Sequence, residues 1–330
     1  MGKKNIAVIA GGDSGEYVIS VKSAEMIRAN LDKSLFDAHN VLIAEGKWQY
    51  VDSKGGVYPI DKNDFSVLLD SGRLHFDCAL ITIHGTPGEN GLLQAYFDLI
   101  GIPHTTAGML ASSLTFNKYY CNLVVSKLGY PVPRAVLLKK GEAYSEYVLV
   151  KHLGIPVFVK PNEGGSSLGM TFVHDPTELG AAIDLAFEHD DNILVEEYLE
   201  GVELTCGVFK HKNEIRPLPV TEIVSKTKAQ YFDFEAKYTP GAADEITPAR
   251  IEDTLTEKVK EHSVQLYKLL NLNGLVRFDY IYCRETLYFI EVNITPGMTE
   301  TSLVPQAAAV EGISNTELFT MLIEEALRGG

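Results

Sequence analysis

Near its carboxyl end the chain reads LVRFDYIYCRETLYFIEVNITPGM, and this stretch, which begins at Leu275, most strongly limits what the chain can fold into. Apolar and polar residues alternate on both sides of a short polar turn (RET), which predicts an antiparallel β-hairpin. The register sets Asp279 opposite Glu291 and Arg277 opposite Asn293 on one face. The other face is predicted to be apolar and buried, and it consists of Val276, Phe278, Tyr280, Tyr288, Ile290, Val292 and Ile294.

Two carboxylates that face each other across a sheet, with Cβ atoms about 5 Å apart, repel each other unless a cation lies between them. Asp279, Glu291 and Asn293 offer the hard oxygen ligands that Mg²⁺ takes while it keeps waters and binds phosphate oxygens. A solvated polar face, on which Arg277 neutralises the acids, is the alternative that this stretch leaves open. The hairpin therefore predicts either a metal site or a charge-balanced surface.

Size and charge exclude several classes of protein. At 330 residues the chain is long enough for two or three domains with cores of their own. Its net charge of -15 argues against a nucleic-acid partner, which requires a basic surface. The four cysteines form no Cys-x-x-Cys pair, which favours reduced thiols. No apolar run approaches a signal peptide or the roughly 20 residues of a membrane span, so we expect a cytoplasmic protein without a membrane partner.

The amino-terminal part has the strand–helix order of a parallel α/β sheet. Asn5–Ala10 and Asp77–Ile83 are predicted to be buried strands, and a helix capped by Ser20 follows the first of them. The intervening glycines do not fit G-x-G-x-x-G, which disfavours a dehydrogenase. Glu16 and His84 follow strand ends, where open α/β sheets bind ligands. An exposed glutamate and a histidine that caps a strand are the alternatives.

A phosphate-binding loop is predicted in the middle of the chain. Lys160 closes a strand and precedes Asn-Glu-Gly-Gly-Ser-Ser-Leu-Gly, and Lys118 lies on a helix predicted from Ser113 to Gly129. A loop with many unhindered backbone N–H groups can fold over phosphates while a lysine supplies charge. It lacks the Gly-Lys-Ser/Thr ending of a P-loop. A solvent-exposed hairpin is the alternative.

Two further segments suit a nucleotide. The predicted strand NILVEEY ends in Glu196 and Glu197, with Glu203 beyond it, and such acids and backbone groups could read an adenine edge and ribose hydroxyls; surface acids are the alternative. Residues 225–248 lack periodicity and carry lysines and aromatics, which predicts a lid that orders over an anionic ligand.

Together these features describe an ATP site without a P-loop, and at this point the sequence resembles the D-alanine–D-alanine ligases of the ATP-grasp superfamily. The resemblance extends over essentially the whole chain, and its ordered set of motifs is highly specific. These motifs are Gly-Gly-x-Ser-x-Glu16, His84-Gly85, Lys160-Pro-x-x-x-Gly-Ser-Ser-x-Gly169, Glu235-Ala-Lys-Tyr238, Arg277-x-Asp279, Glu291-x-Asn293 and Pro296-Gly-Met-Thr-x-x-Ser302-Leu303.

The resemblance implies a mixed α/β, three-domain ATP-grasp fold, with ATP between the central and carboxyl-terminal domains. We expect domains at residues 1–112, 113–198 and 199–330, the last carrying the lid. The resemblance further implies a homodimer that uses ATP and two Mg²⁺ ions, with Mn²⁺ as a substitute. It would make D-alanyl-D-alanine for peptidoglycan through a D-alanyl phosphate. The carboxylate of one D-alanine attacks the γ-phosphate, and the amine of the second then displaces phosphate.

The resemblance also assigns roles to individual residues. The residues expected to hold the metals are Asp279, Glu291 and Asn293. Those expected to bind the nucleotide are Lys118, Lys160, Ser166, Ser167, Glu196, Glu197, Glu203 and Lys237. Those expected to bind D-alanine are Glu16, His84, Arg277, Gly297, Ser302 and Leu303. The expected catalytic set is Glu16, Ser166, Tyr238, Arg277, Gly297 and Ser302.

Three positions depart from the family's pattern without removing a metal or phosphate ligand. Tyr17-Val18 replaces a more polar pair after Glu16, Thr86-Pro87 interrupts the string after His84-Gly85, and Ile294 replaces a threonine. The alternatives are a relative that joins D-alanine to D-lactate or D-serine, and a nucleotide-binding sensor without turnover. Tyr238 favours D-alanine as the second substrate by resemblance, and the intact Arg277 weighs against a sensor.

Overall fold

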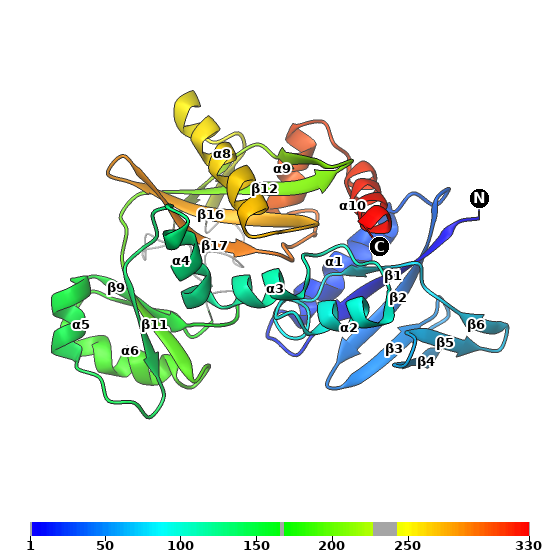
Figure 1. Cartoon of the computed structure of the whole chain (residues 1–330), viewed down its shortest axis with the longest axis horizontal. Coiled ribbons are helices and arrows are strands. Elements are labelled where there is room, and N and C mark those ends of the chain that lie inside the picture. Colours follow the sequence, from blue (N-terminus) through cyan, green and yellow to red (C-terminus); the bar gives the residue numbers. More distant parts are fainter. Residues whose placement is uncertain (1, 166–167, 227–242, 330) are drawn as a thin grey trace.

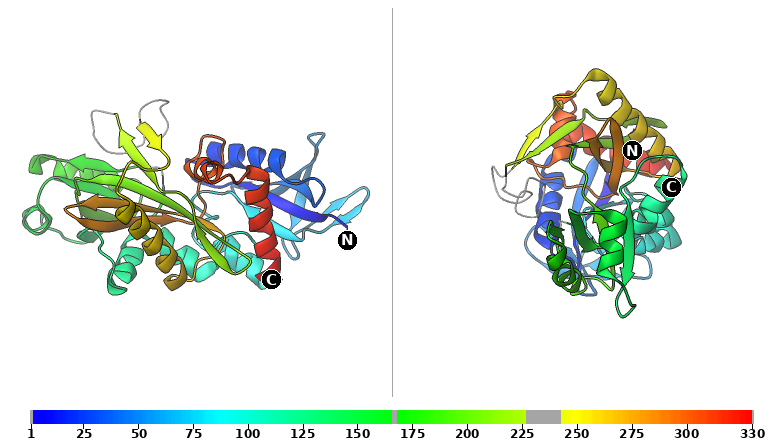
Figure 2. Two further views of the ribbon diagram at one scale, coloured as in Figure 1. Left: turned by 90° about the horizontal axis from the view of Figure 1, so that it is seen from above. Right: turned by 90° about the vertical axis from the view of Figure 1, so that its left-hand side faces the viewer.

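A computed structural model of the chain describes residues 2–165, 168–226 and 243–329. These residues form three β-sheets with helices packed against them (Figure 1). The amino-terminal and central sheets lie toward opposite ends of the long axis, and the carboxyl-terminal sheet lies between and above them (Figures 1 and 2). No helix among the described residues is long and apolar enough to span a membrane.

The amino-terminal sheet has seven strands in the order β6-β5-β4-β3-β2-β1-β7. Its strands are β1 (Lys4–Gly11), β2 (Phe36–Ala44), β3 (Lys47–Val51), β4 (Val57–Asp61), β5 (Ser66–Leu69), β6 (Gly72–Leu74) and β7 (Cys78–Ile81). The predicted parallel arrangement is confirmed for β1 with β2 and β7. The antiparallel extension through β3 to β6 was not predicted. The helices α1 (Tyr17–Asn30) and α2 (Leu92–Ile100) complete this part.

The predicted start of α1 was wrong. Ser20 does not cap the helix, which begins at Tyr17 with Glu16 in the N-cap position. The Ser20 hydroxyl instead accepts a hydrogen bond from the backbone N–H of Gly11 at 3.0 Å, which ties the helix to the end of β1. Because the helix starts earlier, Glu16 lies directly at its amino-terminal end.

The predicted helix from Ser113 to Gly129 is two helices. They are α3 (Met109–Phe116) and α4 (Lys118–Lys127). Asn117 has extended backbone, and its side chain caps α4 by accepting a hydrogen bond from the N–H of Tyr120. A local side-chain cap therefore restarts the helix at Lys118, which places this lysine in the first turn of α4.

The central sheet is antiparallel, with the order β10-β9-β11-β8. Its strands are β8 (Ala135–Lys139), β9 (Val157–Pro161), β10 (Thr171–Val173) and β11 (Asn192–Glu197). Its helices are α5 (Glu146–Leu153), the 3₁₀ helix η1 (Pro176–Glu178) and α6 (Leu179–Ala186). They bury a cluster of apolar side chains that belongs to this part alone.

The carboxyl-terminal sheet has the order β15-β14-β12-β16-β17, and β13 pairs with β12 beside it. Its strands are β12 (Val202–His211), β13 (Glu214–Pro217), β14 (Thr221–Ser225), β15 (Ala243–Ile246), β16 (Leu275–Cys283) and β17 (Thr286–Asn293). The helices in this part are α8 (Asp253–Leu269), α9 (Leu303–Val310) and α10 (Asn315–Gly329).

The hairpin β16–β17 has the predicted register at the two polar pairs, with Asp279 opposite Glu291 and Arg277 opposite Asn293. A β-bulge follows, because Tyr280 pairs with Phe289 and leaves Ile290 without a cross-strand partner. The prediction that Tyr288 and Ile290 lie on the buried face was therefore wrong. The residues of β17 and its continuation that are buried are Leu287, Phe289, Val292 and Ile294.

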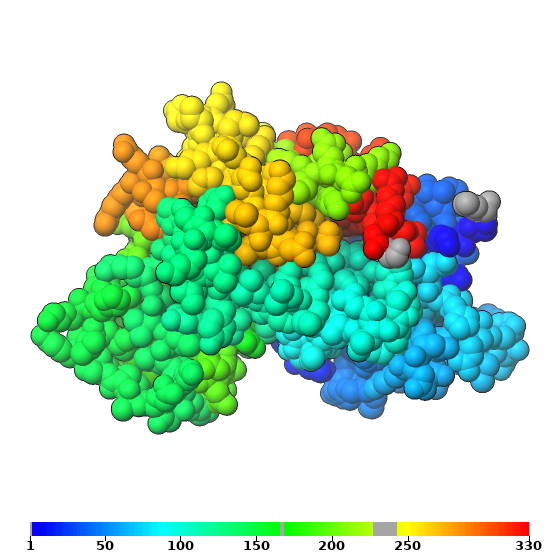
Figure 3. All heavy atoms as spheres, viewed as in Figure 1, coloured from blue at the N-terminus to red at the C-terminus, as the bar shows by residue number. Residues whose placement is uncertain are grey.

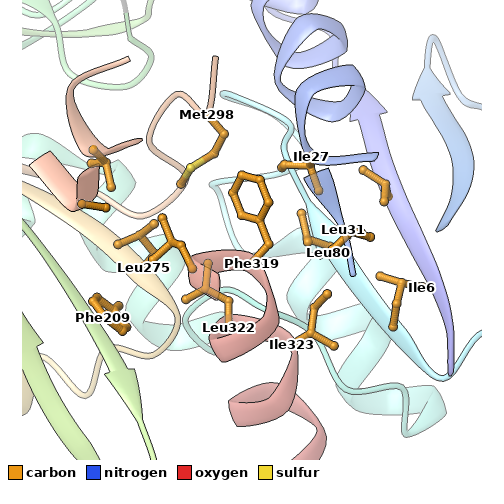
Figure 4. Packing of buried hydrophobic residues seen from close by; sticks show 14 of the residues in the cluster. Ile6, Ile27, Leu31, Leu80, Phe209, Leu275, Met298, Phe319, Leu322 and Ile323 are labelled. Carbon is orange, nitrogen blue, oxygen red and sulfur yellow. The ribbon is translucent and has the colours of Figure 1, made fainter. Parts of the chain in front are cut away.

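The amino- and carboxyl-terminal parts share one hydrophobic core through α10. Phe319, Leu322 and Ile323 lie between Ile6, Ile27 and Leu80 on one side and Phe209, Leu275 and Met298 on the other (Figure 4). Since each fully buried apolar side chain contributes about 1.5–3 kcal/mol, this layer fixes the two parts against each other. The side chains that these parts contribute to a common site are therefore held in a constant arrangement.

Candidate active site

Two cavities meet where the three parts of the molecule converge. The first, of about 250 Å³, is lined by Glu16, Glu89, Glu245 and Glu291, and we call it the acidic cavity. The second, of about 170 Å³, is lined by Lys160 among aromatic and aliphatic side chains, and we call it the lysine cavity. Five residues line both, namely Lys118, Gly164, Gly165, Arg277 and Glu291.

The polar face of the hairpin forms the wall between the cavities. Arg277 donates two hydrogen bonds to Asp279, from Nε to Oδ1 and from Nη2 to Oδ2, both at 2.8 Å. Asn293 accepts the backbone N–H of Thr295 at 2.9 Å through Oδ1. Arg277 thus neutralises Asp279 as in the charge-balanced alternative, but this face lines cavities rather than an open surface.

The donor set on this wall fits a hard divalent cation. Asp279, Glu291 and Asn293 contribute two carboxylates and an amide, the oxygen ligands of Mg²⁺ sites that also use phosphate oxygens and water. In residues 2–165, 168–226 and 243–329, no group of three or more His, Cys, Asp or Glu side chains could hold a metal by itself. A metal at this wall would therefore depend on the amide and on ligand oxygens as well.

The start of the predicted phosphate loop, at Gly164 and Gly165, lies close to Lys118 on α4 and to Glu16 at the start of α1. Lys118 donates from Nζ to the carbonyl of Gly164 at 2.6 Å. A Cβ atom on Gly165 would lie 2.8 Å from Oε2 of Glu16, so this glycine lets the carboxylate approach the loop closely. The loop, α4 and the start of α1 thus converge beside the hairpin wall. Ser166 and Ser167 lie outside the described residues.

Lys160 and Glu196 form a buried ion pair inside the lysine cavity. Nζ of Lys160 lies 2.6 Å from Oε1 of Glu196, and the two side chains are 12% and 4% exposed. The second oxygen of Glu196, Oε2, is buried and has no hydrogen-bond partner within the described part of the chain. A buried acceptor without a hydrogen-bond partner lowers the stability of the fold. This oxygen is therefore suited to accept a hydrogen bond from a ligand.

The other two predicted acids differ in their surroundings. Glu203 on β12 lines the lysine cavity. The carboxylate of Glu197 binds Arg134 instead, accepting the backbone N–H and both Nε and Nη2 at 2.6–2.8 Å. Glu197 nevertheless lines the lysine cavity, and its nucleotide role stays a prediction.

An aromatic and aliphatic wall in the lysine cavity was not predicted. Phe158 lies 5.8 Å from Tyr198 between ring centroids, and Ile290, exposed to the cavity by the β-bulge, lies across from them. Such surfaces suit a flat base. Phe158 precedes Lys160 by two residues in β9, so strand alternation alone could have placed both side chains on one face.

His84 is buried at the rim of the acidic cavity. Its side chain has an Nε2 atom without a partner among the described residues, and burial lowers its pKa, so the ring is neutral at neutral pH. Its backbone carbonyl accepts the hydroxyl of Ser14 at 2.9 Å, which joins the two predicted loops of the amino-terminal part. The prediction that Glu16 and His84 come together at strand ends is confirmed, since both line this cavity.

Glu89 was missed by the sequence reasoning. Its Oε2 accepts the backbone N–H of Gly85 at 2.6 Å, and burial raises its pKa to about 8. The carboxyl group is therefore mostly protonated at neutral pH and holds the turn that carries His84. Glu89 lies two residues after Pro87 in a turn-rich loop. The sequence there has no periodic pattern that could have identified it.

The loop after the hairpin closes the acidic cavity. A Cβ atom on Gly297 would lie 2.9 Å from Oγ of Ser302, which accepts the N–H of Thr299 at 3.0 Å. The backbone N–H of Met298 donates to Oγ of Ser23 on α1 at 3.2 Å, inside the shared core. Gly297, Ser302 and Leu303 all line the cavity, as predicted for a substrate loop. Lys237 and Tyr238 lie outside the described residues.

Comparisons with known proteins agree with this geometry. Residues 5–107 match the family described as D-ala D-ala ligase N-terminus, and residues 122–324 match D-ala D-ala ligase C-terminus. A D-alanine–D-alanine ligase from Parabacteroides distasonis is 44% identical over 327 residues, which cover 99% of this chain and 98% of the relative.

Solved structures show the same fold over the whole length. A D-Ala:D-Ser ligase from Enterococcus faecalis is 32% identical, with a TM-score of 0.85, and the match covers 98% of this chain and 100% of that one. A Bacillus anthracis D-alanine–D-alanine ligase complexed with ATP is 29% identical, with a TM-score of 0.79 and 98% of each chain covered. The chain belongs to the D-alanine–D-alanine ligase family and has its mixed α/β ATP-grasp fold.

Proposed function

We propose that the chain joins two D-alanines in the acidic cavity while ATP lies in the lysine cavity. As a member of this family, the chain is an ATP-dependent ligase of D-alanine, and its product serves peptidoglycan synthesis. The observation that carries the arrangement is that the two cavities share one wall, which bears Arg277 and Glu291. A phosphoryl group can pass from ATP to D-alanine only where the two cavities adjoin, which is at these shared residues.

In the first step, the carboxylate of one D-alanine attacks the γ-phosphate of ATP to give D-alanyl phosphate and ADP. The Glu16 carboxylate binds the ammonium of this D-alanine, and neutral His84 lies near its carboxylate. Lys118 and Lys160 supply positive charge to the phosphates, as do the N–H groups of the glycine-rich loop. Phosphoryl transfer depends mainly on such positioning and charge neutralisation, which the convergence of these groups supports.

In the second step, the ammonium of the other D-alanine first loses a proton, and the resulting amine attacks the acyl carbon. Phosphate then leaves, and the nitrogen releases a second proton as the amide forms. Arg277 and the backbone N–H of Gly297 stabilise the oxyanion of the tetrahedral intermediate, and Ser302 and Leu303 receive the second substrate. Arg277 is 18% exposed at its side chain and is fixed by Asp279, so it is preorganised for this role. Closure of the predicted lid over the cavities, which would exclude water from the acyl phosphate, belongs to this proposal. Within residues 225–248, Ala243–Ile246 form β15 of the carboxyl-terminal sheet, and residues 227–242 lie outside the described residues.

Two Mg²⁺ ions, or Mn²⁺ in their place, would be held by Asp279, Glu291 and Asn293. When bound, such ions neutralise developing charge on the transferred phosphoryl group. The hard oxygen set on the wall between the cavities supports this assignment. The division into domains at residues 1–112, 113–198 and 199–330 is also proposed, although the first boundary falls within α3.

The proposed activity is tested by D-alanine-dependent release of ADP with detection of the dipeptide by mass spectrometry. We expect ADP and D-alanyl-D-alanine in equal amounts, and no release without D-alanine. ATP binding without release would favour a nucleotide-binding sensor instead.

A second candidate is ligation of D-alanine to D-serine, because a D-Ala:D-Ser ligase is 32% identical over nearly the whole chain. A panel of acceptors separates the two, with D-alanine, D-serine and D-lactate offered at equal concentration. A D-serine or D-lactate product in excess of D-alanyl-D-alanine at neutral pH would reject D-alanine as the second substrate.

We also propose a cytoplasmic homodimer that pairs through the face of α2, α3 and α4. These helices lie along one side of the molecule (Figures 1 and 3) and expose large apolar side chains, with Leu99 86% and Leu110 77% exposed. The other exposed apolar side chains on this face are Leu92, Met109, Tyr120 and Leu123. A charged substitution, Leu110→Lys, should shift the mass measured by light scattering from dimer to monomer. Leu68→Lys, at an equally exposed leucine on β5, should not.

A further inference from the structure

The acidic cavity holds one glutamate that the proposed mechanism does not use. Glu16 is proposed to bind the first ammonium, Glu89 holds the N–H of Gly85, and Glu291 lies on the metal-binding wall. Glu245 lines the same cavity and has no role in either step. A half-buried carboxylate at a substrate cavity calls for a physical reason.

Glu245 lies on β15, at the edge of the carboxyl-terminal sheet, and faces the cavities. It pairs with Ile223 on β14, which in turn pairs with Glu203 on β12. Cross-strand partners share a face of a sheet, and both Ile223 and Glu203 line the lysine cavity. The side chain of Glu245 therefore lies over the same face as Arg277 and the metal-binding wall.

Gln306 connects Glu245 to the substrate loop. Its side chain donates a hydrogen bond to Glu245, and its Nε2 also donates to the carbonyl of Thr301 at 2.7 Å. Gln306 lies in the first turn of α9, whose N-cap Ser302 and first residue Leu303 are proposed to receive the second D-alanine. The Glu245 carboxylate is thus connected, through Gln306, to the loop that is proposed to receive the second substrate.

The charge of Glu245 is incompletely balanced within the described residues. Burial raises its pKa, and Arg277 and the hydrogen bond from Gln306 oppose this rise without cancelling it. Arg277 already gives two hydrogen bonds to Asp279, so its charge is shared. A cationic group brought by a ligand would complete the electrostatic balance.

We propose that Glu245 binds the ammonium group of the second D-alanine and thereby selects an amino acid over a hydroxy acid as acceptor. The inference deepens the proposed function and rests on it. Each of the two substrates then has a glutamate for its ammonium, Glu16 for the first and Glu245 for the second. D-Lactate brings a carboxylate and a hydroxyl but no cation, so it cannot supply the missing positive charge to Glu245, and sites built for a missing polar group discriminate strongly.

The test is the dependence of dipeptide formation on D-alanine concentration, which gives separate KM values for the first and second substrate. Glu245→Gln keeps the shape and removes the charge. We expect the second KM to rise about tenfold or more, because a hydrogen bond to a charged acceptor is stronger than one to a neutral acceptor. The first KM and the KM for ATP should change by no more than about twofold, because uniform damage to the fold would move all three.

A competition between D-alanine and D-lactate gives an independent readout by mass spectrometry. The ratio of dipeptide to depsipeptide should fall about tenfold or more in Glu245→Gln. Glu222→Gln is the matched control, because it removes a carboxylate from the adjacent strand, where Glu222 binds Arg250 outside the acidic cavity. The control should leave the second KM and the ratio unchanged.

The outcomes separate the two proposals. If the wild-type protein forms dipeptide and Glu245→Gln leaves the second KM and the ratio unchanged, the role of Glu245 is overturned and the proposed function stands. If the wild-type protein forms no dipeptide, both fail. Should Glu245→Gln not fold, Glu245→Asp, which keeps the charge and withdraws it by one methylene, must still raise the second KM selectively; an unchanged value would overturn the role.

Discussion

The two cavities lie on either side of one wall, yet they differ in how their charges are balanced. In the lysine cavity the central charge is a buried Lys160–Glu196 pair, only 2.6 Å apart, among aromatic and aliphatic side chains. In the acidic cavity Glu89 accepts a backbone N–H, and Glu245 faces the side-chain amide of Gln306 and the charge of Arg277.

The difference reflects the ligands that each cavity suits. A purine base gains from apolar walls and a few fixed polar groups, so its cavity can neutralise its own charges in advance. Each amino acid brings an ammonium group, so a half-buried carboxylate such as Glu245, whose raised pKa Arg277 and Gln306 only partly oppose, is matched by the substrate itself. The wall with Arg277 and Glu291 belongs to both cavities, and the predictions below separate what is shared from what is not.

The largest effect is expected at the shared wall. Glu291→Gln should lower turnover by at least about a thousandfold, because Glu291 is proposed to hold the Mg²⁺ ions that neutralise charge on the transferred phosphoryl group. The protein should remain folded, since Glu291 faces the cavities rather than the core. The measurement is D-alanine-dependent ADP formation at millimolar Mg²⁺, with circular dichroism to check the fold.

Glu285→Gln serves as the control, because it makes the same change in the exposed turn of the same hairpin. It should retain wild-type turnover. Retained activity in Glu291→Gln would contradict the proposed metal-binding role of Glu291.

Next in size is the loss of one partner from the lysine cavity. Lys160→Met should destabilise the fold by about 3–5 kcal/mol, because it leaves the charge of Glu196 buried and unpaired. It should also raise the KM for ATP while leaving both KM values for D-alanine unchanged. Denaturant unfolding and steady-state kinetics measure the two effects.

The double variant Lys160→Met with Glu196→Gln separates stability from binding. It should regain most of the lost unfolding free energy, since no unpaired charge stays buried, but not the affinity for ATP. If ATP binding returned together with stability, Lys160 would have only a structural role.

A smaller effect, on how the unfolding free energy depends on pH, is expected for Glu89 in the acidic cavity. Its pKa is raised from 4.5 to about 8 by burial, so the folded state holds a proton that the unfolded state releases. This contribution to stability is complete below pH 4.5 and is lost as the pH rises through 8. Glu89→Gln, which keeps an acceptor for Gly85, should therefore be about 2–4 kcal/mol more stable than wild type at pH 9.

The measurement is the unfolding free energy between pH 5 and 9, and the difference should shrink toward the acid end. Glu214→Gln, on an exposed glutamate of β13, should show no such pH dependence. A difference that is constant across this range would mean that Glu89 is ionised in the folded state.

The smallest effect concerns the link between the substrate loop and α1. Ser23→Ala removes the acceptor of the Met298 N–H and should cost about 1 kcal/mol of unfolding free energy. It should also raise a KM for D-alanine, because the loop that carries Gly297 is no longer fixed. Ser112→Ala removes another buried hydroxyl, bound to the carbonyl of Ala107, and should cost similar stability without the kinetic effect. Equal KM values in the two variants would contradict the positioning role of Ser23.

The sequence by itself determined the features that depend on local alternation and order. Period-two patterning was enough to place Asp279 opposite Glu291, because strand geometry fixes which side chains share a face. It also put Lys160 at the end of a strand and Glu16 and His84 after buried strands, and all three line the cavities. The four cysteines are free and buried, as their spacing suggested.

Only the tertiary structure decided what depends on contacts between distant segments. The pair of Lys160 with Glu196 and the layer of α10 between two sheets join residues far apart in the chain, which no local pattern encodes. The β-bulge at Ile290 and the start of α1 before Ser20 differ from what the local sequence pattern predicts. Pairing with the neighbouring strand sets the first, and the Ser20 hydroxyl binds the end of β1 instead of capping the helix. The surroundings of Glu245 arose in the same way, since β14, α9 and Arg277 meet only in the folded chain.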